Sequence, residues 1–446
     1  MPKVAFHTLG CKVNQYETEA ITEQFLARGY SVVDFEEFAD IYIVNTCTVT
    51  NVADKKSRKM LSKAKKLNDK SVVVAIGCYV QVAHDTLEDT SFIDVLIGNT
   101  HKNEVVNIVE DYIETNLKCD IIENVQEDIV YEELHIDTQQ SKARSTIKIQ
   151  DGCNQYCTYC IIPYTRGKIR SREPESVLSE VRALALKGYH EIILTGIHLG
   201  SYGKDLQDVE LIDLIEDLDA IDGIDRIRLG SLEPNFINEA LLKRLVACQS
   251  VCDHFHLSMQ SGSDSVLSRM KRHYNSEKYF DKVELIRKFY KTPAITTDVI
   301  VGFPMETDEE AQDTYNFVKK VRFSELHVFK YSIRQGTKAA EMKPQINGLV
   351  KTSRSKKLSE LGKIMHQEYL EKFLNKEVPV LLEDVLDLDG KTYKVGHTTN
   401  YMKVYLLIDK NLDGRVRLDH DSNKPGEIKP LVLTSLFKDG LLGILN

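Results

Sequence analysis

Residues 147–160 read Ile-Lys-Ile-Gln-Asp-Gly-Cys-Asn-Gln-Tyr-Cys-Thr-Tyr-Cys, an apolar run that leads directly into three closely spaced cysteines. The run predicts a buried strand over residues 147–149. Cys153, Cys157 and Cys160 follow with the spacing Cys-x3-Cys-x2-Cys. In α/β barrels the ligand-binding residues lie directly after the strands, at the carboxyl ends where the parallel strands stop. The segment therefore predicts a barrel that carries a ligand site at the carboxyl ends of its strands.

The residues after this segment repeat the alternation of strand and helix. Five more apolar runs predict strands at residues 191–194, 226–229, 254–258, 295–301 and 326–329. Six strand–helix units fit an open or partial barrel better than a closed eight-unit one. A charged helical stretch over about 351–373 leads out of it. We assign residues 144–373 to this central domain.

The residues before the segment show the same alternation. Their apolar runs predict buried parallel strands with helices between them. The predicted strands are 4–9, 41–44, 72–76 and 95–97, and the predicted helices are 15–28, 52–66 and 103–114. This pattern predicts an open parallel α/β sheet, which we assign to an N-terminal domain over residues 1–120. The acidic residues 121–143 lack clear periodicity and are interpreted as a linker.

The last part of the chain, residues 374–442, changes character. Short alternating runs predict strands at 378–382, 403–407, 415–418 and 428–433. Turn signals separate them, at Asp389-Gly390, Asp413-Gly414 and Pro425-Gly426. This pattern predicts a small antiparallel β-barrel of the oligonucleotide-binding size class.

The net charge argues against a protein that binds nucleic acid through an overall excess of positive charge. The chain has 58 Lys and Arg against 67 Asp and Glu, so it is not basic on average. Two basic segments nevertheless adjoin cysteine motifs, residues 51–70 and 139–172, each with a net charge of +6. A solvated face is the plain interpretation of one such segment, but two beside cysteines favour a polyanionic substrate. We expect residues 51–70 and 166–172 to hold phosphates.

The cysteine count and the apolar runs indicate the compartment. Nine cysteines, an odd number, argue against a disulfide framework and favour metal or cluster ligation. No run of about 18 apolar residues and no secretory pattern is present. We therefore expect a cytoplasmic protein that does not enter a membrane.

The spacing of Cys153, Cys157 and Cys160 suits one particular cofactor. Three thiolates in a tight loop can hold a [4Fe–4S] cluster and leave its fourth iron without a protein ligand. The amino and carboxylate groups of S-adenosylmethionine (SAM) can chelate such an iron, which makes radical chemistry accessible. A zinc site, usually built from paired Cys-x2-Cys motifs, and ordinary core cysteines are the alternatives. The motif predicts a radical SAM centre, with no catalytic side chain assigned beyond the cluster ligands.

Other residues at predicted strand ends are candidates for contacts with SAM. Glycines that end strands let a ligand approach the backbone, although many are simple turns. The candidates are Thr195, Gly196, Glu233, Gln260 and Gly302. The run Cys248-x3-Cys252-x-His254-x-His256 resembles a metal site, but we interpret it as a helix end followed by a strand.

Three scattered cysteines share one structural position. Cys11, Cys47 and Cys78 each follow a predicted strand of the N-terminal sheet. Carboxyl ends of parallel strands meet at one edge, which is where ligands bind in open α/β folds. The pattern thus places three thiols within reach of one metal centre. Ordinary buried cysteines and a flavin-binding, flavodoxin-like domain are the alternatives.

The sequence as a whole resembles the methylthiotransferases, which are radical SAM enzymes with two [4Fe–4S] clusters. The resemblance covers essentially the whole chain. Its motifs are Thr8–Asn14, Val44–Thr50, Ile76–Tyr79, Cys153–Gly167, His256–Ser263 and Thr297–Pro304. It implies that Cys11, Cys47 and Cys78 hold an auxiliary cluster that delivers sulfur. It also implies that the C-terminal barrel is a TRAM domain, a module that contacts RNA or protein.

The segments around Cys11 and Cys47, together with His397–Tyr401, resemble the branch that acts on N6-threonylcarbamoyladenosine. The resemblance implies addition of a methylthio group to C2 of that nucleoside at position 37 of tRNA. One SAM would donate the methyl group, and a second would give the radical that removes the C2 hydrogen. Met305 departs from the family, which usually has Gly there. If that turn needs a positive φ, the side chain of Met makes this backbone conformation energetically unfavourable.

The resemblance also implies partners. These are the anticodon stem-loop of tRNA, an electron donor such as flavodoxin or ferredoxin, and a sulfur source. Two alternatives keep the chemistry and change the substrate, to isopentenyladenosine in tRNA or to an aspartate of a ribosomal protein. A third, from another class, is a non-catalytic iron–sulfur protein that binds RNA or senses redox state.

Overall fold

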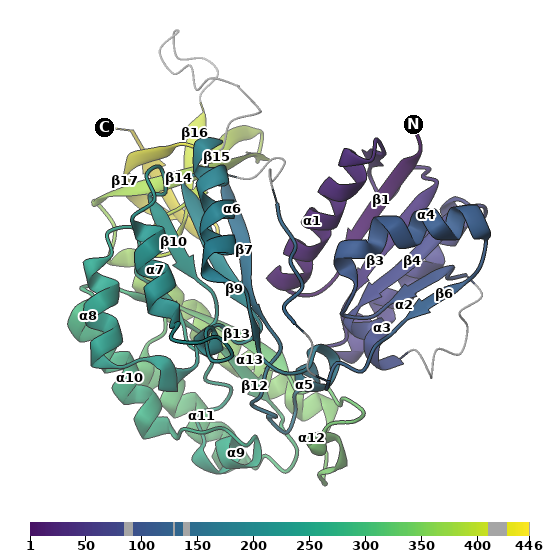
Figure 1. Ribbon diagram of the computed structural model, residues 1–446. Helices are drawn as coiled ribbons and strands as arrows, with labels where there is room; N and C mark the ends of the chain where they lie inside the picture. The colour runs from purple at the N-terminus through teal and green to yellow at the C-terminus, as the bar shows by residue number, and fades with distance from the viewer. Residues whose placement is uncertain (84–91, 128–129, 137–142, 409–425, 446) are drawn as a thin grey trace.

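The computed structural model describes residues 1–445 except for 84–91, 128–129, 137–142 and 409–425. Figure 1 shows a parallel sheet with helices, an arc of strands and helices, and a small β-barrel near the C-terminus. The first two parts pack together, because helix α1 (Lys12–Ala27) contacts strands β7 (Arg144–Asp151) and β9 (Glu191–Gly196). Among the described residues, no helix has both the length and the apolar character needed to cross a bilayer.

The N-terminal sheet has six parallel strands in the order β2-β1-β3-β4-β5-β6. Its two faces are both apolar, so its strands are covered on both sides by helices. Its strands are β1 (Lys3–Thr8), β2 (Ser31–Val33), β3 (Ile41–Thr46), β4 (Val72–Gly77), β5 (Val95–Ile97) and β6 (Cys119–Ile121). Its further helices are α2 (Asn51–Leu67), α3 (Cys78–Ala83) and α4 (Val105–Thr115). The boundary predicted at residue 120 falls inside β6.

Six parallel strands in chain order form the arc. Two hydrogen-bonded sheets, β10-β9-β7-β8 and β11-β12-β13, meet through two isolated bridges, Ile227 to Val251 and Leu232 to Leu257, which join β10 and the residue stretch after it to the residues around β11. The remaining strands are β8 (Arg170–Ser171), β10 (Arg226–Leu229), β11 (His254–His256), β12 (Ala294–Val301) and β13 (Glu325–Lys330). The expected partial (β/α)6 barrel is therefore present.

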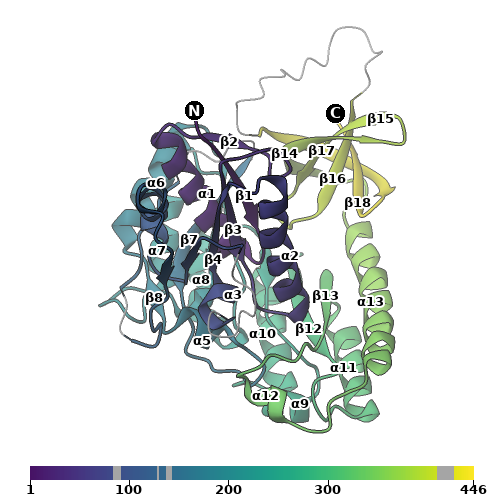
Figure 2. The same ribbon diagram turned by 90° about the vertical axis from the view of Figure 1, so that its right-hand side faces the viewer.

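Helices cover the outside of this partial barrel, as Figures 1 and 2 show. The helices of this part are α5 (Ile162–Arg166), α6 (Pro174–Leu186), α7 (Leu211–Asp219), α8 (Glu239–Ala247), α9 (Asp264–Arg269), α10 (Ser276–Phe289), α11 (Asp308–Val321), α12 (Lys338–Glu341) and α13 (Gly348–Glu371). Ile147, Ile192 and Phe255 pack in the core under the helices. Since strand side chains alternate, the intervening residues face the concave side, which we call the lumen.

The C-terminal part is a closed barrel in the order β14-β15-β16-β18-β17. Its strands are β14 (Glu377–Leu388), β15 (Lys391–His397), β16 (Lys403–Ile408), β17 (Ile428–Phe437) and β18 (Gly440–Ile444). The Asp389-Gly390 turn joins β14 and β15 with positive φ at both residues, as two-residue hairpins require. The strand predicted at 415–418, the Asp413-Gly414 turn and Pro425 lie outside the described residues. Strands β15 and β18 were not predicted.

The loop between β15 and β16 closes one end of the lumen. The Arg226 guanidinium donates to the carbonyls of His397 and Pro379, at 2.9 and 2.8 Å. Arg228 donates in the same way to the carbonyls of Thr398 and Thr399. Both arginines stand on β10, on the face opposite its core residues. The β-barrel thus covers the end of the lumen where the strands begin.

Candidate functional site

The three clustered cysteines lie in the loop between β7 and α5. Cys153 and Cys157 are buried, and Cys160 is half-buried. Burial raises the pKa of Cys153 to about 11 and that of Cys160 to about 12, and the neighbouring thiols add to both shifts. Gly152 enables the turn, since a Cβ there would lie 1.7 Å from the carbonyl oxygen of Lys168. The loop thus gathers three thiols that would release protons on binding a metal.

An arginine from a distant part of the chain contacts this loop. Arg272 donates a hydrogen bond to the Cys157 sulfur at 3.2 Å. The same guanidinium forms an ion pair with Glu233, at 2.5 and 2.7 Å. Glu233, one of the predicted SAM contacts, therefore lies beside the cysteine loop. Sequence reasoning missed Arg272, because nothing near residue 272 indicates a partner 115 residues away.

Of the other predicted SAM contacts, Thr195 and Gly196 lie near the cysteine loop, whereas Gln260 lies beside β12. Thr195 is buried at the end of β9, and the adjacent Gly196 packs against Gln150, whose amide donates to the carbonyl of Gly152. These two residues therefore lie near the cysteine loop. Gln260 pairs with β12 through its backbone and has a φ of 68°.

Gly302 faces the outer helix. A Cβ at Gly302 would lie 2.3 Å from Cγ of Lys351 on α13, and its backbone has a φ of 69°. Packing against Lys351 therefore explains why a glycine stands there. The Cys248–His256 run is a helix end followed by strand β11, as expected, with both cysteines buried.

The structure brings Cys11, Cys47 and Cys78 together at one edge of the N-terminal sheet. A Cβ on Gly10 would lie 3.2 Å from the Cys47 sulfur, and Cys78 influences the pKa of both Cys11 and Cys47. Burial raises the pKa of Cys47 to about 11. Three sulfur donors at one point suit a thiophilic metal or an iron–sulfur cluster.

Two asparagines hold the loops that carry these cysteines. The Asn14 amide donates to the carbonyls of Leu9 and Thr46, at 2.9 and 3.0 Å, and so connects the loops after β1 and β3. The Asn99 amide donates to the Cys78 sulfur at 3.5 Å and to the carbonyl of Thr165 at 2.7 Å. Because Thr165 lies on α5, Asn99 also connects this cysteine set with the first.

Buried charges lie between the two sets of cysteines. Glu17, which is fully buried on α1, accepts hydrogen bonds from Lys102 at 2.6 Å, Lys148 at 2.9 Å and Arg166 at 3.0 Å. Arg166 also pairs with Asp151, two residues before Cys153. Burial alone would raise the pKa of Glu17, but the three cations outweigh it and hold that pKa well below its usual range. The network joins the sheet to the partial barrel without an unpaired charge.

This network corrects one prediction about phosphate binding. Arg166, Arg170 and Arg172 are buried, and each has a carboxylate partner within the protein. Only Lys168 of the basic residues in 166–172 is exposed. The segment therefore cannot serve as the expected phosphate-binding surface, because its arginines join the two α/β parts instead.

The other basic segment forms helix α2. This helix begins four residues after Cys47, where the Thr50 side chain caps it by accepting from the amide of Ala53 at 3.1 Å. Lys55, Lys56 and Lys59 are exposed along it. This part of the expectation is compatible with the structure, which leaves these cations on the surface beside the cysteine edge.

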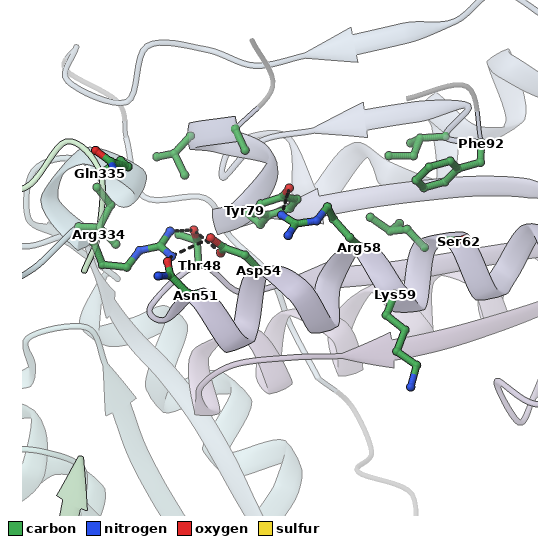
Figure 3. Close-up of a pocket in the computed structure, with 15 residues that line it drawn as sticks. Thr48, Asn51, Asp54, Arg58, Lys59, Ser62, Tyr79, Phe92, Arg334 and Gln335 are labelled. Atoms are coloured by element: carbon green, nitrogen blue, oxygen red, sulfur yellow. Dashed lines mark hydrogen bonds and ion pairs between the residues drawn. The ribbon is translucent and has the colours of Figure 1, made fainter. Parts of the chain in front are cut away.

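A cavity of about 740 Å³ lies beside the start of α2 (Figure 3). Arg334, in the segment after β13, spans part of it and pairs with Asp54 at 2.7 Å and with Asn51 at 3.0 Å. Arg58 donates to the hydroxyl of Tyr79 at 2.9 Å on the same wall. Arg334 thus connects the partial barrel to the helix that follows Cys47.

Comparisons with known proteins agree with this architecture. Residues 147–318 match the model of the radical SAM superfamily, and residues 3–98 match that of the uncharacterized protein family UPF0004. A threonylcarbamoyladenosine tRNA methylthiotransferase MtaB of Bacillus subtilis is 41% identical over 93% of both chains. Its namesake in Aquifex aeolicus is 40% identical over 88% of this chain and 97% of its own. A tRNA-2-methylthio-N(6)-dimethylallyladenosine synthase of Thermoanaerobacter sp. is 35% identical over 92% and 88%.

Solved structures share the fold at low identity. The radical SAM methyltransferase TsrM of Kitasatospora setae, with cobalamin and a [4Fe–4S] cluster bound, matches with a TM-score of 0.56 and 15% identity. The match covers 76% of this chain and 77% of that one. The cobalamin-dependent radical enzyme OxsB matches with a TM-score of 0.51 and 13% identity, over 83% of this chain and 56% of that one. These matches show that the fold of most of this chain also occurs in known structures.

Proposed function

We propose the following function from the premise that this chain belongs to the tRNA methylthiotransferases of the radical SAM superfamily. The chain adds a methylthio group to C2 of N6-threonylcarbamoyladenosine at position 37 of tRNA. The observation that carries the proposal is the identity of 40 and 41% to relatives named for that nucleoside, against 35% for a relative named for dimethylallyladenosine.

Two cysteine sets would hold the cofactors. Cys153, Cys157 and Cys160 would hold one [4Fe–4S] cluster, and Cys11, Cys47 and Cys78 the other. Each set offers three sulfur donors and, among the described residues, no fourth cysteine, because Cys119 begins β6, and Cys248 and Cys252 lie between α8 and β11. When bound, a cluster with one iron free of protein ligands supplies the electron that cleaves SAM to a carbon radical.

The protein's own residues position the reactants. Arg272 and Glu233 lie at the Cys157 loop, where they would orient the polar groups of SAM. Thr195, Gly196, Gln260 and Gly302 remain proposed contacts, with Gly302 the weakest because it packs against α13. The buried charges around Glu17 fix the spacing between the two cysteine sets, so a base placed between them meets both at constant distance.

The proposal also names partners and an organisation. The anticodon stem-loop would bind along the exposed lysines of α2, and its target base would leave its stack to enter the lumen. A flavodoxin or ferredoxin would supply electrons, and a separate donor the sulfur. We propose a cytoplasmic location. We also propose a division into domains at 1–120, 144–373 and 374–442 with a linker at 121–143, the last domain being of the TRAM type.

One reaction tests the substrate. Anaerobically reconstituted protein receives SAM, a reductant and a sulfur source with anticodon stem-loops that carry threonylcarbamoyladenosine or dimethylallyladenosine. We expect mass spectrometry of the digested nucleosides to find the 2-methylthio product from the first RNA only. Product from the second RNA alone would overturn the assignment. Release of no 5′-deoxyadenosine with any substrate would indicate a non-catalytic iron–sulfur protein.

Iron counting tests the cofactor sites. Reconstituted protein should hold about eight irons, and the Cys47→Ala and Cys157→Ala variants about four each, from four irons per cluster. Cys248→Ala is the matched control, since Cys248 is also buried but belongs to the end of α8. It should retain about eight irons. Equal iron contents in all variants would contradict the proposed ligands.

A further inference from the structure

Three side chains of the kinds that bind metal ions lie on neighbouring strands of the partial barrel. His256 is on β11, Asp298 on β12 and His327 on β13, and Asp298 and His327 are register partners. The residues beside them along these strands, such as Phe255 and Val299, belong to the core under the outer helices. Because side chains alternate along a strand, the three polar side chains face the lumen instead.

The donor atoms of these three side chains converge. One ring nitrogen from each histidine and one carboxylate oxygen of Asp298 all lie within 4.8 Å of one another. The imidazole rings of His256 and His327 are stacked, with their centres 5.9 Å apart and an angle of 28° between their planes. The two nearly parallel rings therefore present nitrogens to the region that the carboxylate also reaches.

The separation of His256 and Asp298 is that of two ligands around a metal ion. Nε2 of His256 lies 3.5 Å from a carboxylate oxygen of Asp298. A good N–H···O hydrogen bond is shorter, at about 2.7–3.2 Å. Metal–nitrogen and metal–oxygen bonds of about 2.0–2.2 Å instead place neighbouring ligands about 3–3.5 Å apart. The observed gap therefore suits an ion between the two groups better than a direct hydrogen bond.

Thr296 orients the ring of His256. Its hydroxyl lies 2.9 Å from Nδ1 of His256, so the two ring nitrogens have different neighbours. When Nδ1–H donates to this hydroxyl, Nε2 keeps its lone pair for a metal ion, which is the usual arrangement of metal-binding histidines. The same hydroxyl lies 3.4 Å from Nε2 of the buried His254, which accepts its proton in turn. A chain of hydrogen bonds thus supports His256 from behind.

The other two side chains are open to the lumen. His327 is exposed and makes no hydrogen bond or ion pair with any residue that the structure describes. The side chain of Asp298 is 32% exposed. Polar groups that serve only the fold are usually satisfied within it. These two groups instead remain available to a ligand from the lumen.

We propose that His256, Asp298 and His327 form a site for a divalent transition-metal ion. Two imidazoles and one carboxylate are a donor set for ions such as Mn²⁺, Fe²⁺ and Zn²⁺, and three protein ligands leave further coordination positions open. The open positions face the lumen, where they take water or an oxygen atom of a molecule that enters. The site shares no ligand with the two cysteine sets and does not depend on which nucleoside the protein modifies.

The sequence did not indicate this site, because its ligands come from three different strands. The run Cys248-x3-Cys252-x-His254-x-His256 resembled a metal site of another composition. Both of its cysteines are buried, and Cys248 packs in the apolar core. Only His256 of that run belongs to the site, and its partners are on β12 and β13.

Manganese binding to the anaerobically reconstituted, full-length protein tests the site. Mn²⁺ prefers oxygen and nitrogen donors to thiolates, so cysteines compete little for it. Oxidised [4Fe–4S] clusters are diamagnetic, so the electron paramagnetic resonance signal of added Mn²⁺ distinguishes free from bound ion. After passage over a chelating resin, the protein should bind about one Mn²⁺ per chain. Pulsed measurements should show nitrogen coupling from the bound imidazoles.

Substitution of the ligands should remove this binding. His256→Gln, Asp298→Asn and His327→Gln should each weaken Mn²⁺ binding by about 100-fold or more, beyond the loss that removal of an outer hydrogen-bond partner causes. Thr296→Val removes only such an outer partner and should weaken binding by about 10-fold. Iron and sulfide contents equal to those of wild type show that the variants fold. His327→Gln is the variant expected to disturb folding least, because His327 is exposed.

Asp225→Asn is the matched control. Asp225 pairs with His190 at 2.7 Å on the surface, which is the same combination of groups without a third donor. This variant should bind Mn²⁺ as wild type does. Wild-type protein that binds no Mn²⁺, or ligand variants that bind it as tightly as wild type, would overturn the site. An equal loss of binding in Asp225→Asn would also overturn it, because the loss would then follow from the lower negative charge alone.

Discussion

Arg272 donates a hydrogen bond to the sulfur of Cys157 over 3.2 Å. A positive charge and a hydrogen bond at a cluster ligand favour the reduced, more negative cluster. Arg272→Gln should therefore lower the reduction potential of the cluster proposed for this loop by tens of millivolts. A redox titration followed by electron paramagnetic resonance measures this in a Cys47→Ala background, which is expected to lack the second cluster. Arg272→Lys keeps the charge and should shift the potential less, so equal shifts would speak against an electrostatic cause.

Removal of the Glu17 carboxylate should leave its cations without compensation. Glu17→Gln is expected to destabilise the protein by about 3–5 kcal/mol, the range for breaking a buried ion pair. Urea unfolding of the apoprotein measures the change. The matched control is Glu110→Gln, which breaks a surface pair with Arg28 and should cost less than about 1 kcal/mol. Similar losses in both variants would mean that the buried network contributes no more than a surface pair.

The pair formed by Glu310 and Arg269 predicts a pH-dependent contribution to stability. Hydrogen bonds from Arg269 lower the pKa of Glu310 from its ordinary value of 4.5 to about 2. A depressed carboxyl pKa stabilises the fold above the unfolded value, and the contribution disappears as the pH falls from about 4.5 toward about 2.

Glu310→Gln should therefore lose about 2 kcal/mol of unfolding free energy at pH 7. The difference from wild type should shrink at pH 3.5. Glu309→Gln, its neighbour on α11, is the control and should show little difference at either pH. A loss in Glu310→Gln that stays constant between pH 7 and pH 3.5 would contradict the assigned pKa.

Met305 has a φ of 65°, in the left-handed region that its sequence position suggested. That conformation destabilises a residue with a side chain by about 1–2 kcal/mol. A glycine avoids this strain, but it loses more conformational entropy on folding, which offsets part of the gain. Met305→Gly should raise the free energy of unfolding by about 0.5–1 kcal/mol. Met305→Ala keeps the strain and should bring no gain. Destabilisation by glycine would show that the exposed side chain contributes more than the strain.

Because the lysines of α2 are exposed, we predict that the affinity of the protein for RNA falls as the salt concentration rises. Lys55→Ala combined with Lys56→Ala should weaken binding of the stem-loop and reduce the slope of log Kd against log salt concentration by up to about 2, one phosphate contact per lysine. Filter binding at several salt concentrations measures the slope. Lys356→Ala combined with Lys363→Ala on α13 makes the same change in charge and should leave the slope unaltered. Equal slopes for both double variants would remove α2 from the RNA surface.

Local patterns predicted the elements well, because strand and helix periodicity is a local property. Strand β10 was predicted with its observed ends, and the order of parallel strands was enough to expect Cys11, Cys47 and Cys78 at one edge. The structure brings these thiols together, while their role as ligands stays a prediction. The same reasoning failed for strand β15, since its alternation is weak in Lys391–His397.

Pairing between distant charges could not be predicted from sequence. Arg166 looked like a phosphate ligand because it stands in a basic segment, yet its partner Glu17 lies 149 residues away. Gly302 stays a proposed ligand contact, but its close packing against Lys351 could not be predicted, because that residue comes from a helix much later in the chain. A sequence gives the residue types at a site, but the folded structure decides which charged side chains are buried and paired with one another.

The loop that carries Tyr401 covers the end of the partial barrel where its strands begin. Its ring lies under the guanidinium groups of Arg144 and Arg228, 5.0 and 4.7 Å from them, where the strands begin. Among the described residues, this loop therefore blocks passage through the end where the strands begin. If the proposed function holds, spent cofactor and finished nucleoside would both depart on the side away from this loop, and turnover would depend on the order in which they leave.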